Sequence, residues 1–402
     1  MKIKGLKSMF LFKGYVLEKI HFSAEIVQAY LRRDKRHAVK CPHCGRSMTV
    51  RRETTQSARD LALGPAIHVL LVYPAVQGYC PRCRKRATVR PPGIQPHAKA
   101  TWRLMKFVSR LCRHMPNTAA GELVGVDDVT AGRWDRAVLA AELPEPDFDA
   151  VDKLLVDEKH LGARHGYVTV VLDADTGALL HMAEGKKKKS LQSFFDKLSP
   201  AQKAGIKAVC LDRAGHYRTV AEDNCPNAVI VYDRFHIMKN YNDTVDEIRR
   251  REAAQASASQ KKLIAGQRFN LLRNPENLRD SAEEQLRTLL EANETLNTCY
   301  ILRDALRQLW RYRYRAWGER YFHRWDAWAR ASGIRQLKRF ADSLQKHADG
   351  ILNYFQYRIT QGPIESFNNV IARILHRACG LKDLDYLYLK LRQQSLNKAA
   401  QT

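Results

Sequence analysis

The chain has 402 residues, 45% of them hydrophobic and 27% charged. It is therefore long enough for two or three globular domains and too apolar for a disordered chain. Lys and Arg number 68 against 42 Asp and Glu, which gives a net charge of +26. A charge of this sign and size indicates a polyanionic partner and disfavours small acidic substrates.

The positive charge is concentrated in two windows. Residues 1–100 carry 20 Lys and Arg against 5 Asp and Glu, and residues 301–350 carry 12 against 5. No run of 18 apolar residues is present, and the first residues lack a small-residue cleavage site, so we expect a cytoplasmic, nucleoid-associated protein. Nine cysteines, only four of them in C-x-x-C pairs, suit a reducing compartment.

The first module is predicted to bind zinc. Two knuckles, Cys41-Pro-His-Cys44 and Cys80-Pro-Arg-Cys83, supply four thiolates for one tetrahedral site, with a β-hairpin between them that includes residues 66–76. Four unrelated buried thiols are the alternative. Basic residues surround the knuckles and are expected either to contact DNA phosphates or to form a solvated surface; we select Arg46, Arg82, Arg84, Lys85 and Arg86.

Pro-rich segments at 90–97 and 143–150 divide the chain, and the segment between them is predicted to be helical. Residues 117–134 have the pattern of a helix-turn-helix, with Gly125 at the turn and a second helix capped by Asp127 or Asp128. A three-helix spacer is the alternative. If the segment reads DNA, the side chains on its second helix that do so are Thr130, Arg133 and Arg136.

The rest of the chain begins as a sheet. Short apolar runs at 153–161, 167–177, 178–185, 206–212 and 228–233, with helical patterns after the third and fourth, predict the order β-β-β-α-β-α-β. Residues 237–350 have a helical pattern throughout. A last helix is predicted to begin at Gly362-Pro363.

Three carboxylates occupy positions suited to metal-assisted chemistry on a polynucleotide. Asp157 ends the first strand of this sheet, Asp212 ends the fourth, and Glu365 lies in the first turn of the last helix. Carboxylates so placed can hold two divalent ions about 4 Å apart. A single Asp after a strand is otherwise a common turn cap, and Glu158 is the poorer candidate because it points to the opposite face.

Other polar residues are predicted near this site. Asp233 is the rival second carboxylate, and His236 of the Asp233-Arg-Phe-His sequence either contacts a catalytic group or is structural. Asn368 and Asn369 share the helical face of Glu365. Lys186 and Lys187 begin a run that either attracts a phosphate or is solvated. Aromatic and Arg residues alternate over 310–330, which suits either base stacking or helix packing.

Several of these motifs together resemble one known family. The "CPHCG" knuckle, "VDEKHLGARHGYVTVVLDADTGALLHMAEGKKKKSL", "YDRFHIMKNYNDTVDEIRR", "LWRYRYRAWGERYFHRW" and "GPIESFNNVIARI" are similar to sequences of the ISL3 insertion-sequence transposases. The resemblance implies a multidomain α+β protein with a zinc ribbon, a helix-turn-helix, and an RNase H-like catalytic domain with a mixed sheet interrupted by an all-α insertion. With the Pro-rich segments and the helical block as boundaries, we expect these domains at 1–97, 98–142, 151–239, 240–350 and 351–402.

The resemblance also implies an activity. Asp157, Asp212 and Glu365 would be the three carboxylates of a DDE transposase that holds two Mg²⁺ or Mn²⁺ ions, cuts DNA at the terminal inverted repeats and joins it to a target. We expect one structural Zn²⁺, double-stranded DNA as partner and at least a homodimer. The alternatives are a DNA-binding regulator with a relic catalytic domain and a simple RNase H-type nuclease.

Overall fold

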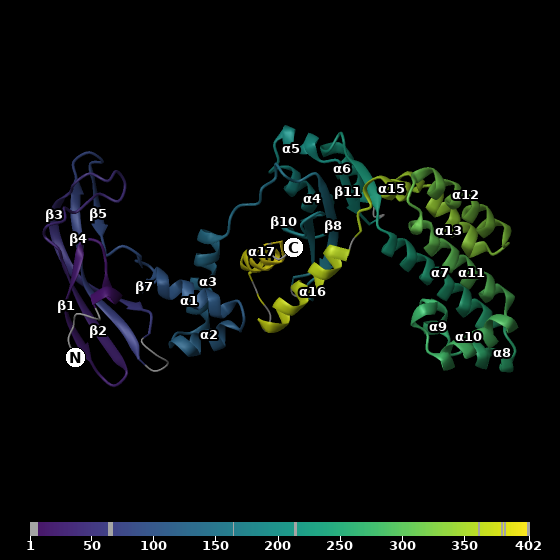
Figure 1. The fold of residues 1–402 in the computed structure, drawn as a ribbon, viewed down its shortest axis with the longest axis horizontal. Helices are drawn as coiled ribbons and strands as arrows, with labels where there is room; N and C mark the ends of the chain where they lie inside the picture. The colour runs from purple at the N-terminus through teal and green to yellow at the C-terminus, as the bar shows by residue number, and fades with distance from the viewer. Residues whose placement is uncertain are drawn as a thin grey trace. The chain divides into compact units, whose positions relative to one another are not determined.

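A computed structural model describes residues 7–62, 67–163, 165–212, 215–360, 362–378, 381 and 383–399. The chain forms two compact units: Met1–Pro144 with Arg373–Gln393, and Glu145–Ala372 with Gln394–Thr402 (Figure 1). In the described part of the chain, no helix is both long and apolar enough to cross a membrane.

The first unit begins with a short 3-10 helix, Lys7–Phe10, and a seven-stranded sheet of order β1-β2-β4-β3-β7-β6, with β5 paired to β4. The strands are β1 (Tyr15–Phe22), β2 (Ile26–Arg33), β3 (Thr49–Asp60), β4 (His68–Cys80), β5 (Lys85–Val89), β6 (Ile94–Gln95) and β7 (Ala100–Thr101). Alternate side chains of β4, such as Val69, Leu71 and Tyr73, enter the core. Pro74 lies between the stretches of β4 that pair with β2 and with β5, where its missing N–H is tolerated.

Three helices follow the sheet: α1 (Trp102–Cys112), α2 (Asn117–Val124) and α3 (Asp128–Glu142). The turn between α2 and α3 contains Gly125 at φ +68°, a conformation that favours glycine. The Asp127 carboxylate caps α3 by accepting the N–H of Thr130, so one of the two predicted caps is confirmed. The Arg59 guanidinium donates to the carbonyls of Val124 and Gly125, which ties the end of α2 to the sheet.

The second unit contains a five-stranded mixed sheet of order β10-β9-β8-β11-β12. The strands are β8 (Lys153–His160), β9 (Tyr167–Asp173), β10 (Leu179–Glu184), β11 (Ala208–Leu211) and β12 (Val229–Tyr232), and the helices among them are α4 (Lys188–Phe195), α5 (Pro200–Gly205) and α6 (Gly215–Asn224). The first three strands are antiparallel, and β11 runs parallel to both β8 and β12. The predicted order of strands is confirmed, and the single helix predicted between the third and fourth strands is two helices, α4 and α5.

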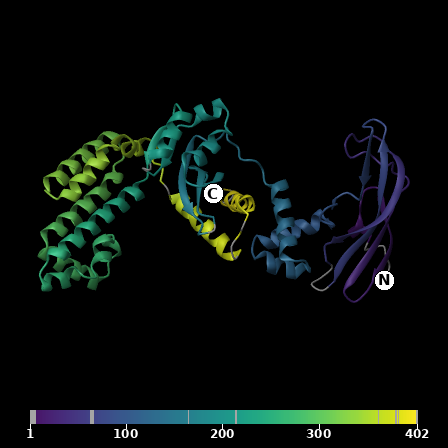
Figure 2. The same ribbon diagram turned by 180° about the vertical axis from the view of Figure 1, so that it is seen from behind.

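A helical segment follows β12, as predicted. It comprises α7 (Arg234–Gln255), α8 (Ala258–Ile264), α9 (Arg268–Leu272), η2 (Pro275–Asn277), α10 (Asp280–Ala292), α11 (Glu294–Gln308), η3 (Leu309–Arg311), α12 (Arg315–Ala331), α13 (Arg335–Gln345), α14 (Ala348–Leu352) and α15 (Tyr354–Tyr357). Helices α7, α11, α12 and α13 pack side by side (Figure 1, Figure 2) around the buried rings of Tyr241, Trp325 and Phe340.

Helix α14 returns to the sheet. A Cβ on Gly350 would lie 2.4 Å from the ring of Tyr232 in β12, so only glycine allows this approach.

Helices α16 (Gly362–Arg377) and α17 (Leu384–Ala399) end the described chain, and both contribute residues to each unit. The predicted last helix is therefore α16, which begins at Gly362 with Pro363 second.

Candidate metal centre and active site

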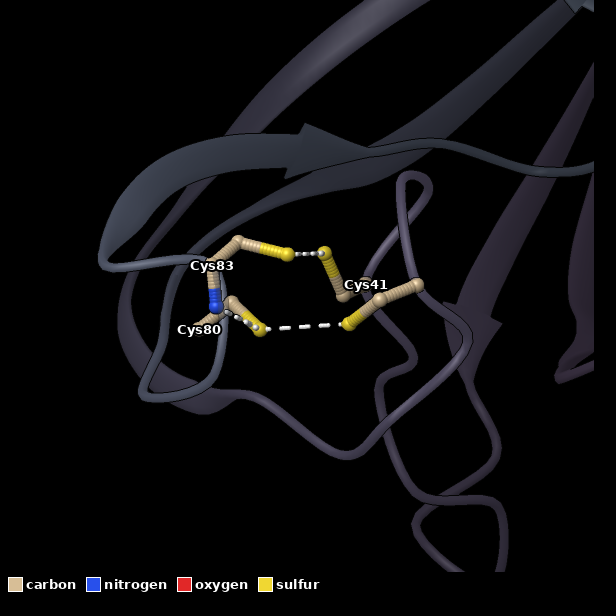
Figure 3. A group of neighbouring side chains, drawn as sticks. Cys41, Cys80 and Cys83 are labelled. Atoms are coloured by element: carbon tan, nitrogen blue, oxygen red, sulfur yellow. Dashed lines mark hydrogen bonds between the residues drawn. The ribbon is translucent and has the colours of Figure 1, made fainter.

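The four knuckle cysteines converge in the first unit. Their sulfur atoms all lie within 4.8 Å of one another, with 4.0 Å between Cys41 and Cys83 and 3.5 Å between Cys44 and Cys80. Figure 3 shows the labelled cysteines turned toward a common point from two facing loops. Sulfur atoms bound to one zinc at about 2.3 Å in a tetrahedron are roughly 3.8 Å apart, so the cluster fits Zn²⁺.

Backbone contacts hold the knuckles in place. Cys41 N–H donates to the Arg46 carbonyl, Gly45 N–H donates to the Cys41 carbonyl, and Cys83 N–H points to the Cys80 sulfur at 3.5 Å. The pKa of the Cys83 thiol is raised to about 12, mainly by the hydrogen bond with the Cys44 thiol and secondly by burial. A bound cation would reverse this preference, because it stabilises thiolates.

The predicted DNA-contacting residues near the knuckles lie at the surface. Arg46, Arg82, Arg84, Lys85 and Arg86 are all exposed.

The three candidate base-reading side chains of α3 differ in their partners. Thr130 donates its hydroxyl proton to the Asp127 carboxylate at 2.8 Å, and Arg133, which is exposed, donates to the Thr130 hydroxyl at 3.1 Å. Arg136 instead pairs with Asp383 and Asp385 at the start of α17. Of the two arginines, only Arg133 has no carboxylate of the described residues within ion-pair distance, so it is the better placed to reach DNA.

Asp212 directly follows β11, as predicted, but Asp157 does not end its strand: it lies inside β8, which continues to His160. The strand register relates the positions of three aspartates. Parallel pairing joins Ala208 to Lys153 and Cys210 to Leu155, and the same offset continued by two residues sets Asp212 opposite Asp157. The pairing of Leu211 with Tyr232, continued by one residue, sets Asp233 opposite Asp212. Opposite positions on adjacent strands lie about 4.8 Å apart and point to the same face.

The helix that carries the third carboxylate contacts this row. The Asn368 amide in α16 donates to an Asp157 carboxylate oxygen at 2.8 Å, and Glu365 lies one turn before Asn368 on the same helix. Asn369 is exposed. In the described chain only the cysteines form a group of three or more ligands in mutual reach, so the oxygens of Asp157, Asp212 and Glu365 do not form one metal-binding cluster.

Exposure distinguishes the two candidates for the second carboxylate. The Asp212 side chain is 42% exposed and lies 3.6 Å from Nδ1 of His236. Asp233 is 2% exposed, and its carboxylate caps α7 by accepting the His236 N–H at 3.2 Å. Asp212 is therefore the more accessible to an ion from solvent, whereas Asp233 has a structural task.

A second polar group, missed from the sequence, lies on the other face of β8. Glu158 is 3.5 Å from Nε2 of His216, and the Tyr217 hydroxyl is hydrogen-bonded to Thr169 at 2.7 Å. Burial raises the pKa of the Glu158 carboxyl. The "HY" pair after Asp212 was the only signal for this group.

The two lysines selected from the sequence lie near the start of α4. The Lys186 ammonium lies over the Tyr167 ring at 4.0 Å. Lys187 is the N-cap of α4 and makes no side-chain cap bond.

Comparisons with known proteins give the family. The sequence model of a transposase family, the ISL3 type, matches residues 154–391. The transposase for insertion sequence element IS1001 of Bordetella parapertussis is 31% identical over 396 residues, 97% of each chain. The transposase for insertion sequence element IS1557 of Mycobacterium tuberculosis is 27% identical over 369 residues, 85% of this chain and 82% of the relative. The zinc-compatible cysteine cluster, the aspartate row and these matches lead to one conclusion: the chain belongs to the ISL3 family of insertion-sequence transposases.

Proposed function

We propose that this transposase binds the terminal inverted repeats of its element and catalyses metal-dependent strand cleavage and strand transfer with Asp157, Asp212 and Glu365. The observation that supports the proposal is the parallel register of β11 and β8, which would set Asp212 opposite Asp157 if continued by two residues, together with the hydrogen bond from Asn368 of α16 to Asp157. These carboxylates come from a strand, the end of its parallel neighbour and a helix, so in this proposal the folded sheet and bound ions would bring them together.

The topology supports an RNase H-like catalytic core. In the order β10-β9-β8-β11-β12 the first strand in sequence is central, with two antiparallel strands on one side and two parallel strands on the other. The helices from α7 to α15 are inserted between the last strand and α16. We propose the boundaries 151–239, 240–350 and 351–402 for the core, the insertion and the C-terminal helices.

Each residue of the site has a distinct task in this proposal. Two Mg²⁺ or Mn²⁺ ions, when bound, would activate the attacking water or 3′-hydroxyl and stabilise the leaving oxygen. Asp157 and Asp212 would present their oxygens to these ions, and the exposed Glu365 side chain would turn toward them. The Asn368 amide fixes the orientation of Asp157, while His236 lies near enough to orient Asp212.

The first unit is the proposed DNA reader. Residues 1–97, with one Zn²⁺ held by the four cysteines, would contact phosphates through exposed arginines, and the helices within 98–142 would read base edges through Thr130 and Arg133. Because paired ends must be cut together, we propose a homodimer or higher oligomer on double-stranded DNA.

The test is cleavage of labelled terminal-repeat DNA in Mg²⁺ by conservative variants. We expect Asp157→Asn, Asp212→Asn and Glu365→Gln to lose cleavage by at least about a thousandfold while end binding stays within about twofold. The control Glu222→Gln, on the exposed side of α6, should cut normally. Wild-type cleavage by Asp212→Asn, with loss in Asp233→Asn, would move the second role to Asp233.

Asn368→Ala separates orientation from ligation. Removal of this amide should lower cleavage about 10- to 100-fold and raise the Mg²⁺ concentration needed for half-maximal rate. A wild-type protein that binds the ends but never cuts them would instead indicate a regulator with a relic catalytic domain.

A further inference from the structure

A cavity of about 750 Å³ lies among α7, α9, α11 and the start of α16 in the second unit. Asp233 and Glu365 line it at the end nearest the proposed active site. Its remaining wall is strongly basic; the six cationic residues are Arg234, Lys239, Arg273, Arg303, Arg307 and Arg311. Glu276 is the only other acidic residue among the described residues of the lining.

Arg303 is a buried cation in this wall. It is 4% exposed, and its guanidinium donates to neutral oxygens only: the Asn242 and Asn274 amides and the carbonyls of Leu272 and Arg273. Over the described residues, no carboxylate lies within ion-pair distance of it, and burial lowers its pKa from the usual value. A buried charge without a counterion is unfavourable, so an anion in the cavity would stabilise the site.

Neighbouring residues add to this preference. Arg307 pairs with Glu276, but for Arg273 and Arg311 the described chain contains no carboxylate within ion-pair distance. Trp310 also lines the cavity; it is 8% exposed, and its indole Nε1 is buried without a hydrogen-bond partner among the described residues. Phe235, which is 53% exposed, provides an apolar ring on the same lining.

We infer that this cavity binds the phosphodiester backbone of a single DNA strand next to the cut. The inference rests on the proposed function, because it assigns the strand that leads to the carboxylates. Arginines and an indole N–H supply donors for phosphate oxygens, and an exposed ring offers a stacking surface for a base. The volume is that of a pocket for one small molecule, so it admits one or two nucleotides and no duplex.

The test measures binding of fluorescein-labelled (dT)8 by the full-length protein without added divalent ions, so that no cleavage is needed. The variants are Arg307→Gln/Arg311→Gln and Trp310→Phe, and the matched control is Arg251→Gln, an exposed arginine of α7 outside the cavity lining. We expect the double variant to bind roughly tenfold more weakly. Its log–log salt slope should be shallower by about 0.7 for each phosphate that it no longer binds.

Trp310→Phe keeps an aromatic ring but loses the indole N–H together with the five-membered ring, so it should weaken binding about threefold. Arg251→Gln should bind as the wild type does. A (dT)8 strand with neutral methylphosphonate linkages should bind the wild type and the double variant equally, because the arginines act on phosphate charge. Competition with thymidine 3′,5′-bisphosphate distinguishes a site for free nucleotides from a site for a strand. At a strand site, this compound should displace the labelled strand far more weakly than unlabelled (dT)8 does.

Crosslinking locates the bound strand, because the first unit is also basic. Irradiated 5-iodouracil strands should attach to peptides containing Phe235 or Trp310. Unchanged affinity and salt slope in the double variant, or crosslinks confined to residues 7–101, would overturn the inference. The carboxylate variants test cleavage independently, so strand binding with no cleavage in Mg²⁺ would refute the proposed function alone.

Discussion

His181 in β10 illustrates how burial decides protonation at a single residue. Its Nδ1 lies 3.2 Å from the Lys197 ammonium and its Nε2 lies 3.0 Å from the Ser193 hydroxyl. Because an ammonium only donates, Nδ1 accepts and the neutral ring donates from Nε2. Burial, assisted by the charge of Lys197, lowers the pKa of His181 to about 4.

The free energy of unfolding should therefore decrease as the pH is lowered through a defined range. Between the unfolded pKa near 6.5 and the folded value near 4, the unfolded chain binds the extra proton. The loss should begin as pH falls below 6.5, reach about 2 kcal/mol at pH 5 and level off near 3 kcal/mol below pH 4. We expect the urea midpoint of the wild type to fall more between pH 7.5 and pH 5 than that of His181→Gln; equal decreases would contradict this assignment.

At the scale of single residues, the sequence predicted the position of Asp212 correctly and that of Asp157 only in part. Asp212 directly follows the apolar run of β11, whereas Asp157 lies inside β8, because the strand continues through three polar residues to His160. Helical spacing was enough to predict that Asn368 shares the face of α16 that carries Glu365. The sequence did not predict Glu158 with His216, or Arg303 in its cavity, because those positions depend on which helix covers which face.

At the level of elements, α17 is joined to α3 by a buried ion pair. Asp135 is fully buried, and its oxygens accept from Ser109, Tyr386 and the Lys390 ammonium, which lies 2.9 Å away. Lys390 also donates to the carbonyl of Cys112. The helices of the proposed DNA reader are thus completed by residues near the C-terminus.

Removal of one partner should be strongly destabilising. We expect Lys390→Met to lower the free energy of unfolding of the first unit by about 3 to 5 kcal/mol, because it leaves the Asp135 charge buried and unpaired. Asp135→Asn in the same chain should recover part of this loss. Thermal unfolding followed by the fluorescence of Trp134 and its neighbours measures both; a double variant no more stable than Lys390→Met would contradict a charge-based cause.

Elements with strong periodicity were predictable, and those with mixed faces were not. The apolar strands β8, β9, β11 and β12 were visible as runs. The hairpin of β1 and β2 was not predicted. Most of β3 was not predicted either, because this strand is polar and exposed over its first half. The union of α17 with α3 rests on a pairing 255 residues apart, which local patterns do not report.

At the scale of the whole molecule, loss of zinc should affect the first unit and leave the second unit folded. Purified protein should contain about one Zn²⁺ per chain, and Cys44→Ser/Cys83→Ser should lose it, because two thiolates do not close a tetrahedral site. DNA binding should weaken at all sequences, while the helical circular dichroism of the second unit is retained. His43→Ala is the control: His43 lies inside a knuckle, is exposed and stands outside the cysteine cluster, so the variant should keep its zinc, as elemental analysis would report.

The ion pair between Asp135 and Lys390 also delays completion of the first unit while the chain is being synthesised. At roughly 5 to 20 residues per second, a ribosome needs about 13 to 50 s to travel the 255 residues from one partner to the other. During that interval the nascent helices α1 to α3 lack the ammonium that pairs with the buried Asp135 carboxylate. We therefore expect a message cut short before codon 390 to yield a first unit less stable than that of the full chain, so truncated products of the gene should compete poorly with the finished enzyme for the proposed DNA sites.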